Sequence, residues 1–438
     1  MPLPRALHQL DARVGLSAPL KQLGRKVFPR HWSFLLGHAT LSCFLVLIVT
    51  GIFLTFFYAP STEPTIYTGS AALYQGRELP AAYESIVRLT HDVPGGLLVR
   101  RLHRAAAMLL IALAALHLVR VVLSGAFRRP REVNYHIGWL LLLLAIASAY
   151  TGHLLPLEVL SGTSMRIFYT FIASVPWVGE GLATWVFGGE FPTGTILPRL
   201  HIAHVLLLPG LMIGGMLVHL GLVVRQTHTQ LPIRGVDGER TVRGETLWPQ
   251  TAITFATTTL GVAGLLAFSS VLVPWADVDL HGPYELAIST NASQPDWPLF
   301  WVFGAQRLYP GFHFDVLGAT ISGPFIMGVV LPGLFIMLLL AYPWIERHVV
   351  GDDGLEHHVM QHPFEVPFRA AVVAGILTLL LVLSVAATTD ALARGLLVPV
   401  ERIVQVLRVV TFVLPPVVGA AVGWWAQRRT LTLQEVIE

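Results

Sequence analysis

Two pairs of histidines stand inside very apolar stretches of this chain, at nearly equal spacing. The interval from His103 to His117 is fourteen positions, and that from His204 to His219 is fifteen. At about 1.5 Å of rise per residue, each pair spans roughly 21–22 Å of helix, most of a bilayer core. A polar ring in hydrocarbon is costly, so such histidines are functional candidates. Two pairs at two depths predict two metal centres stacked across a membrane.

The composition predicts a polytopic membrane protein. The 438 residues are 54% hydrophobic and only 13% charged, with a mean hydropathy of +0.65, whereas soluble domains carry about 25% charged residues. Apolar runs long enough to cross a bilayer recur along the chain. We therefore predict an all-α fold with eight transmembrane helices, near residues 33–57, 97–123, 134–153, 202–225, 252–273, 324–345, 370–388 and 404–426.

The distribution of charge predicts the orientation. Lysine and arginine favour one set of loops, which the positive-inside tendency assigns to the cytoplasm, so both termini are expected there. The outward loops 58–96, 154–200 and 274–322 are long, which favours a functional role, and amphipathic segments in them are expected along the outer surface. We divide the chain into five parts: a cytoplasmic segment (1–32), a four-helix bundle that carries the histidines (33–226), a cytoplasmic linker (227–251), a C-terminal part (252–428) and a cytoplasmic tail (429–438).

The cysteine content and the basic residues narrow the function. Cys43 is the only cysteine, so the sequence holds no CxxC metal or redox motif and no CxxCH motif for covalent heme attachment. Any heme must therefore be held by axial ligands and non-covalent contacts. The segment 1–31 lacks the short apolar region of a signal peptide, so we expect the first helix itself to insert. The sequence contains no cluster of basic residues interleaved with aromatic ones, so it gives no indication of nucleic-acid binding.

Glycines repeat the histidine interval on two other helices. Gly37 and Gly51 are separated by the same fourteen positions, as are Gly138 and Gly152. A single intramembrane histidine is more often a packing residue, and small residues are common where membrane helices pack. Two side chains fourteen positions apart lie about 40° apart around a helix, and two that are fifteen positions apart lie about 60° apart. Pro209 can interrupt the fourth helix and change the angle between His204 and His219. The recurrence of nearly the same interval on all four helices favours two porphyrins between them.

Helix direction assigns the pairs to levels. The second and fourth spans run from outside to inside, so His103 and His204 share the outer level and His117 and His219 the inner one. With both axial positions taken by imidazole, iron has no open site, which favours electron transfer over oxygen binding. Two arginines near the helix ends are candidates to bind heme propionates, Arg100 and Arg120. The alternative for Arg100, Arg101 and Arg104 is contact with anionic lipid.

Several longer strings carry a family resemblance. They are WSFLLG…LIVTG, PGGLLVRRLHR, HLVRVVLSGAFRRPRE, LSGTSMRI, FGGEFPTGTILPRLHIAHVLLLPG, THTQLP and SQPDW, and they are spread over nearly the whole chain. The chain resembles cytochrome b of the bc-type quinol–cytochrome c oxidoreductases, most strongly the actinobacterial branch. The resemblance implies two heme b groups, a low-potential outer one on His103 and His204 and a high-potential inner one on His117 and His219.

The resemblance also implies a reaction and partners. Quinol is oxidised at the outer face, one electron passes to a Rieske iron–sulfur subunit, and the other crosses the two hemes to an inner quinone site. A cytochrome c subunit, a homodimeric complex, menaquinone as the quinone and, in the actinobacterial branch, a terminal oxidase are further expectations. The protein would then lie in a bacterial cell membrane.

The outer quinone site is expected near residues 290–310. Quinol oxidation releases protons, so a carboxylate acceptor is required, and Asp296 stands where the family's Pro-Glu-Trp-Tyr motif has its acid, between Pro295 and Trp297. The alternative is a turn or cap residue. The sequence departs from the family in three places: Pro298 replaces the tyrosine, Val302-Phe303 replaces Thr-Glu, and Leu157-Glu158 replaces Asp-Asp. Glu158 is the candidate to take over part of the proton transfer.

At the inner site the resemblance suggests Trp32, Ser33 and His228 as quinone-binding residues, although His228 also fits an interfacial loop. The departures at the outer site leave a second reading open: a divergent paralogue, or a heme membrane anchor of another quinone-linked redox complex with an altered outer quinol site. A hypothesis from another class is a secondary transporter whose buried histidines relay protons, which predicts broken helices and internal repeats.

Overall fold

The computed structural model describes residues 11–15, 17–232, 237–275, 277–285, 296–351 and 354–437, with side chains up to 429. Within these residues eight helices are long and apolar enough to cross a membrane: Trp32–Thr55, Gly96–Leu123, Glu132–Leu154, Ile196–Gln226, Leu247–Leu272, Gly323–Val350, Pro367–Ala386 and Val400–Arg429. The prediction of an all-α membrane protein with eight spans is confirmed. The fourth span begins at Ile196 instead of 202, because its first turns include Pro198 and Arg199, which lower the local hydropathy.

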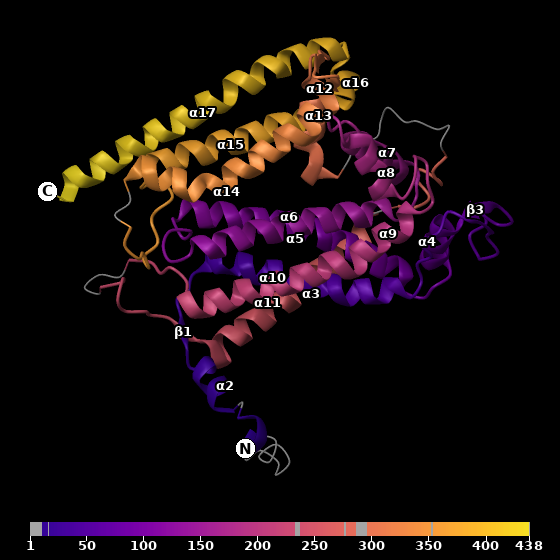
Figure 1. Ribbon diagram of the computed structural model, residues 1–438. Coiled ribbons are helices and arrows are strands. Elements are labelled where there is room, and N and C mark those ends of the chain that lie inside the picture. The colour runs from indigo at the N-terminus through magenta and orange to yellow at the C-terminus, as the bar shows by residue number, and fades with distance from the viewer. Residues whose placement is uncertain are drawn as a thin grey trace.

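Four of the spanning helices form a bundle at the centre of the molecule (Figure 1). Helix α3 packs along α5, and α6 packs along α10. Their bounds are Leu35–Thr55, Gly96–Leu123, Glu132–Leu154 and Leu208–Gln226. A buried apolar cluster that includes Leu110, Trp139 and Met212 fills the space between them. Helix α11 (Ala252–Leu272), which sequence grouping placed in the C-terminal part, packs on α3 and α5, so it lies against the first bundle.

The fourth span is interrupted where Pro209 was expected to disturb it. It consists of α9 (Ile196–Ile202), a π-helical turn η2 (Ala203–Leu207) that contains His204, and α10. Proline has no backbone N–H to donate to the preceding turn, and a π turn holds one residue more than an α turn. The interval of fifteen between His204 and His219 is therefore equivalent to an interval of about fourteen in a regular helix, as found on the other three helices.

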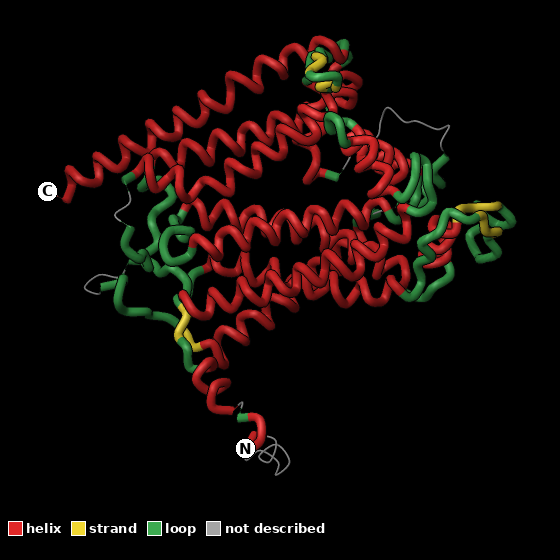
Figure 2. The backbone as a smooth tube through the Cα atoms, viewed as in Figure 1, coloured by secondary structure: helices red, strands yellow, loops and turns green. Residues whose placement is uncertain are grey.

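The remaining spans form a second layer beside α5 and α6 (Figures 1 and 2). This layer comprises α14 (Leu331–Val350), α15 (Pro367–Ala386) and α17 (Val400–Ile437), and α15 packs closely on α17. The guanidinium of Arg369 on α15 donates to the carboxylate of Glu346 on α14 at 2.5 Å, and both side chains are buried. A buried pair of this kind fixes the two helices relative to each other, because removing either partner strands a charge.

Short helices and hairpins occupy the two ends of the bundle. At the end to the right of Figure 1 lie α4 (Ala81–His91), α7 (Val159–Ala173), α8 (Gly179–Phe187), α12 (Phe300–Leu308), α13 (Gly323–Phe325) and α16 (Thr389–Leu396). Two hairpins belong to the same loops, β2 (Pro64–Ile66) with β3 (Glu78–Pro80), and β5 (Phe314–Val316) with β6 (Ala319–Ile321). At the other end β1 (Val27–Phe28) pairs antiparallel with β4 (Glu245–Thr246), near α2 (Ser17–Gly24). The remaining single turns are η1 (Trp32–Phe34), η3 (Leu247–Thr251), η4 (Trp297–Leu299) and η5 (Ile326–Val330).

Candidate functional site

One pair of predicted histidines comes together from α5 and η2. The ring centres of His103 and His204 lie 6.2 Å apart, with their planes at 72°. The Nδ1 atom of His103 is 2.8 Å from the hydroxyl oxygen of Thr50 on α3. The Nδ1 atom of His204 is 2.9 Å from the carbonyl oxygen of Ser148 on α6. Each ring is therefore held through Nδ1, and Nε2 is the nitrogen left to bind a metal.

The spacing of this pair fits a metal clamped between two imidazoles. A metal–imidazole bond is about 2 Å long and the ring centre lies about 1 Å behind the nitrogen, so two axial rings have centres about 6 Å apart. Metal-binding histidines also hold their second ring nitrogen in a hydrogen bond that fixes the tautomer and the ring orientation. Both features are present at His103 and His204.

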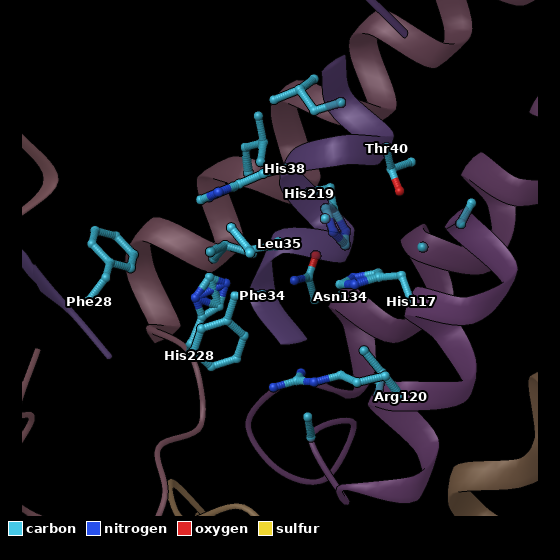
Figure 3. A pocket seen from close by; sticks show the side chains of 18 of the residues that line it. Phe28, Phe34, Leu35, His38, Thr40, His117, Arg120, Asn134, His219 and His228 are labelled. Carbon is cyan, nitrogen blue, oxygen red and sulfur yellow. The ribbon is translucent and has the colours of Figure 1, made fainter. Parts of the chain in front are cut away.

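The second pair lines a cavity of about 640 Å³ inside the bundle. Figure 3 shows the rings of His117 from α5 and His219 from α10 pointing into one space, with Asn134 of α6 beside them. The buried Nδ1 atoms of both rings have no hydrogen-bond partner among the described residues. Two imidazoles that point into one space of this size could hold a metal-bearing group between them.

The four predicted glycines face the four histidines one to one. A Cβ built on Gly51 would lie 3.4 Å from the ring of His103, and one on Gly152 would lie 2.5 Å from the ring of His204. At the other level, a Cβ on Gly37 would be 3.5 Å from His117 and one on Gly138 would be 3.7 Å from His219. The structure thus brings the eight residues together in two groups, each with two imidazoles and two bare stretches of helix backbone.

Buried arginines flank each group. Arg100 on α5 is only 8% exposed, and its Nε and Nη2 atoms have no partner within the described part of the chain. Two nitrogens of this cation are thus buried without a described acceptor, which is unfavourable, so the position favours an anion in addition to the nearby Glu158. Such burial argues against a lipid contact for Arg100. Arg120 lies beside the cavity, where its Nε donates to the hydroxyl of Ser33 at 3.0 Å and its guanidinium stacks 4.6 Å from the ring centre of Phe34.

Two of the three inner quinone candidates, Trp32 and His228, line the same cavity, and Ser33 lies behind its wall. Trp32 lines it and is 74% exposed, whereas Ser33 is buried behind it and accepts from Arg120. His228 also lines it, and its ring stacks on Phe34 with centres 4.5 Å apart. Burial, together with the positive charge of Arg120 and another arginine, lowers the pKa of His228 to about 3. His228 is therefore a buried neutral imidazole and not a solvated loop residue.

A polar cluster lies at the opposite end, around the outer quinone candidates. Asp296 forms an ion pair with Arg104 of α5. It stands at the N-terminus of η4, yet its side chain makes no capping hydrogen bond within the described residues, which argues against the cap interpretation. Glu158 precedes α7, and burial raises the pKa of its carboxyl while Arg100 and Arg104 oppose the shift. Trp297 is exposed in η4, and Pro295 lies outside the described residues.

Some residues of these sites were not anticipated from the sequence. The hydroxyl of Thr50 and the carbonyl of Ser148 hold the rings of His103 and His204. The hydroxyl oxygen of Thr151 also lies 3.3 Å from Nδ1 of His204. A signal was available, because a Thr-Gly dipeptide stands at the outer glycine of both helices, at 50–51 and 151–152. His38, whose buried Nδ1 is unsatisfied by any described residue, lines the inner cavity as well.

Comparison with known proteins bears on the family. A family profile described as cytochrome b (N-terminal)/b6/petB matches residues 108–281. Proteins named cytochrome bc1 complex cytochrome b subunit are similar along most of the chain. The one from Corynebacterium efficiens is 36% identical over 426 residues, covering 96% of this chain and 76% of the relative. Those from Mycobacterium tuberculosis and Streptomyces coelicolor are each 37% identical, covering 95% and 93% of this chain and 75% and 74% of the relatives.

A solved structure shares the fold. A chain of a hyperthermophilic respiratory Complex III matches with a TM-score of 0.66 at 19% identity, over 96% of this chain and 100% of that chain. The eight candidate spans and the relatives that are more than a third identical to this chain indicate the same family. The chain is an integral membrane protein and belongs to the family of cytochrome b subunits of cytochrome bc1 complexes.

Proposed function

We propose that this chain is the electron-carrying subunit of a quinol–cytochrome c oxidoreductase and holds two heme b groups, one at each histidine level. The observation that carries the proposal is the pairing of four histidines with four glycines in two groups within one bundle. An unspecific packing role for the histidines would not require a bare backbone opposite each ring. Membership of the family argues against the transporter hypothesis.

The residues of this chain would hold the groups in distinct ways. His103 and His204 would hold the outer group through Nε2, with their rings oriented by Thr50 and the carbonyl of Ser148. His117 and His219 would hold the inner group. Arg100 and Arg120 neutralise the propionates at the two levels. When bound, heme would supply reversible one-electron oxidation and reduction.

At the outer face, we assign proton acceptance to Asp296 and Glu158 and the binding of the quinol ring to the segment with Pro295 and Trp297. Arg104 forms an ion pair with Asp296, whereas burial raises the pKa of the Glu158 carboxyl. The two carboxyls therefore suit different steps of a two-proton release. The electron acceptors there would be a Rieske iron–sulfur subunit and, beyond it, a cytochrome c subunit, within a homodimeric complex that joins a terminal oxidase.

At the inner face, quinone reduction would take place in the mouth of the cavity. Trp32 and Phe34 offer flat apolar surfaces, and Ser33 and His228 offer polar atoms beside them. A neutral imidazole with an unsatisfied nitrogen can hydrogen-bond a quinone carbonyl. Menaquinone is the proposed quinone, and the cytoplasmic membrane of a bacterium the proposed location, with both termini in the cytoplasm.

A second candidate is a divergent paralogue with an altered outer quinol site. Pro298 stands in the first turn of η4, Val302 is buried, and Phe303 packs edge-on against Phe171 of α7 at 6.5 Å between ring centres. The segment that carries these positions is therefore more apolar than in the family pattern. This observation favours a changed quinol specificity over a change in the heme-binding core.

Heme quantitation combined with a turnover assay tests both candidates. The purified complex should contain two heme b per chain in the reduced-minus-oxidised spectrum and should reduce cytochrome c with a menaquinol analogue. His204→Ala should lose the outer heme and keep the inner one. Two hemes without turnover would favour the divergent paralogue, and a colourless protein or an unchanged heme content in His204→Ala would contradict the proposal.

A further inference from the structure

His153 lies next to the outer cluster and has no role in the assignments above. It stands one residue before the end of α6, is buried, and bridges two other segments. Its Nδ1 atom is 3.8 Å from Oδ2 of Asp296, and its Nε2 atom is 3.2 Å from the hydroxyl oxygen of Ser164 on α7. The imidazole thus connects the carboxylate of the proposed quinol site with a buried hydroxyl.

The partners of this imidazole define which nitrogen is basic. A carboxylate only accepts hydrogen bonds, so the proton of the neutral ring belongs on Nδ1, facing Asp296. Nε2 is then the free base and faces the Ser164 hydroxyl, which can donate to it. Arg104 donates to Oδ1 of Asp296, and Oδ2 of the same carboxylate faces His153. The arrangement has the logic of an Asp–His dyad, in which the carboxylate orients the ring and stabilises its protonated form.

A proton taken directly by Asp296 would cost it the ion pair with Arg104, so a neighbouring base that Asp296 orients can take the first proton on the way. Histidine is the side chain that most readily changes protonation near neutral pH, and general bases work best when matched to the working pH. We infer that His153 is the proton-relay residue of the outer quinol site, with Ser164 as the conduit and Asp296 as the partner that positions it. This inference rests on the proposed quinol oxidation.

The step balances within the proposed reaction. One O–H bond of the quinol breaks and its proton passes through the Ser164 hydroxyl to Nε2 of His153, while the proton of the second O–H bond would go to Glu158. The two electrons would leave one to each of the proposed iron–sulfur and heme acceptors. The resulting imidazolium lies beside the negative charge of Asp296. The charged groups that face the ring are Asp296 itself and Arg104 of α5, and Glu158 belongs to the same electrostatic cluster.

The test is the pH profile of quinol oxidation by the intact complex carrying His153→Gln. We expect a loss of kcat of at least tenfold at neutral pH with KM nearly unchanged, and disappearance of the acidic limb of the wild-type profile. Heme content and spectra should stay as in the wild type. The matched control is Tyr150→Phe, which removes another hydrogen bond at the same interface, from the Tyr150 hydroxyl to the Ser164 carbonyl, and should keep the acidic limb.

Two further variants separate a relay from a structural role. Ser164→Ala keeps the imidazole and removes the conduit, so it should reproduce the loss even where His153→Gln fails to assemble. Adding Asp296→Asn to His153→Gln should cost little more, because residues that act as one unit are not additive. An active wild type with unchanged profiles in His153→Gln and Ser164→Ala overturns the inference alone. A heme-loaded wild type without quinol oxidation at any pH overturns the proposed function and the inference with it.

Discussion

The glycines opposite the histidines leave unequal room, and this difference is testable at the level of single residues. A Cβ at Gly152 would lie 2.5 Å from the ring of His204, whereas one at Gly138 would lie at an ordinary 3.7 Å from His219. Gly152→Ala should push the ring away from the Ser148 carbonyl and lose about half of the bound heme. Gly138→Ala should keep nearly all of it. Heme per chain in purified protein measures both, and equal retention in the two variants would contradict the geometry.

A second residue-scale prediction concerns the buried charge of Arg100. In heme-free protein from a heme-deficient host, Arg100→Met should raise the free energy of unfolding by about 1–3 kcal/mol, because it removes a buried donor group with no acceptor among the described residues. In the loaded complex the same change should speed heme loss. Arg30→Met, on an exposed side chain, should do neither. Destabilisation of the heme-free variant would show that Arg100 has a protein partner.

Spacing in the sequence was sufficient to find the histidines and glycines, because all of them except His204, which lies in the π turn, stand on regular helices whose phase can be calculated. It was insufficient for the groups that hold them. The carbonyl of Ser148 leaves no signature in a sequence, since every residue has one. The contact of His153 with Asp296 joins a helix end to a distant loop, and only the tertiary packing of α5, α6 and α7 brings the two together.

At the scale of elements, the π turn in the fourth span decides whether two rings on one helix share a face. Removing Leu206 together with Pro209→Ala should convert the span to a regular helix in which the histidine interval is fourteen, so both histidines keep their places. Removing Leu217 instead leaves the π turn and rotates His204 relative to His219 by about 100°. We expect near-normal heme content in the first variant and loss of one heme in the second. The reverse order would refute the role assigned to the π turn.

The positions of the spanning helices in the sequence were predicted better than the neighbours on which each helix packs. Eight apolar runs gave eight spans, since length and hydropathy suffice for that. The short helices α4, α7 and α8 were expected only as amphipathic segments, because helices of this length have weak periodicity. The packing of α11 on α3 and α5 could not be predicted from the sequence, because the apolar residues of this helix are not gathered on one face.

For the whole molecule, orientation is the property that gives the two histidine levels their meaning. The same bundle inserted the other way would place the Asp296 cluster in the cytoplasm and the cavity of Trp32 and His228 outside. Arginines concentrate at the end with the cavity: Arg120, Arg128, Arg129 and Arg131 follow one another at the junction of α5 and α6. The positive-inside tendency therefore favours the proposed orientation, with this end in the cytoplasm.

The single cysteine makes this orientation directly measurable. Cys43 is fully buried, so the unaltered protein should not react with a membrane-impermeant maleimide. Ala18→Cys near the N-terminus and Gln427→Cys near the C-terminus, both exposed, should react only from the cytoplasmic side of sealed vesicles. Thr65→Cys in β2 should react only from the opposite side. Labelling of Ala18→Cys and Gln427→Cys from opposite sides would refute an even number of spans. Labelling of both from outside would keep the fold but exchange the outer and inner sites, and quinol oxidation would then have to be sought beside His228.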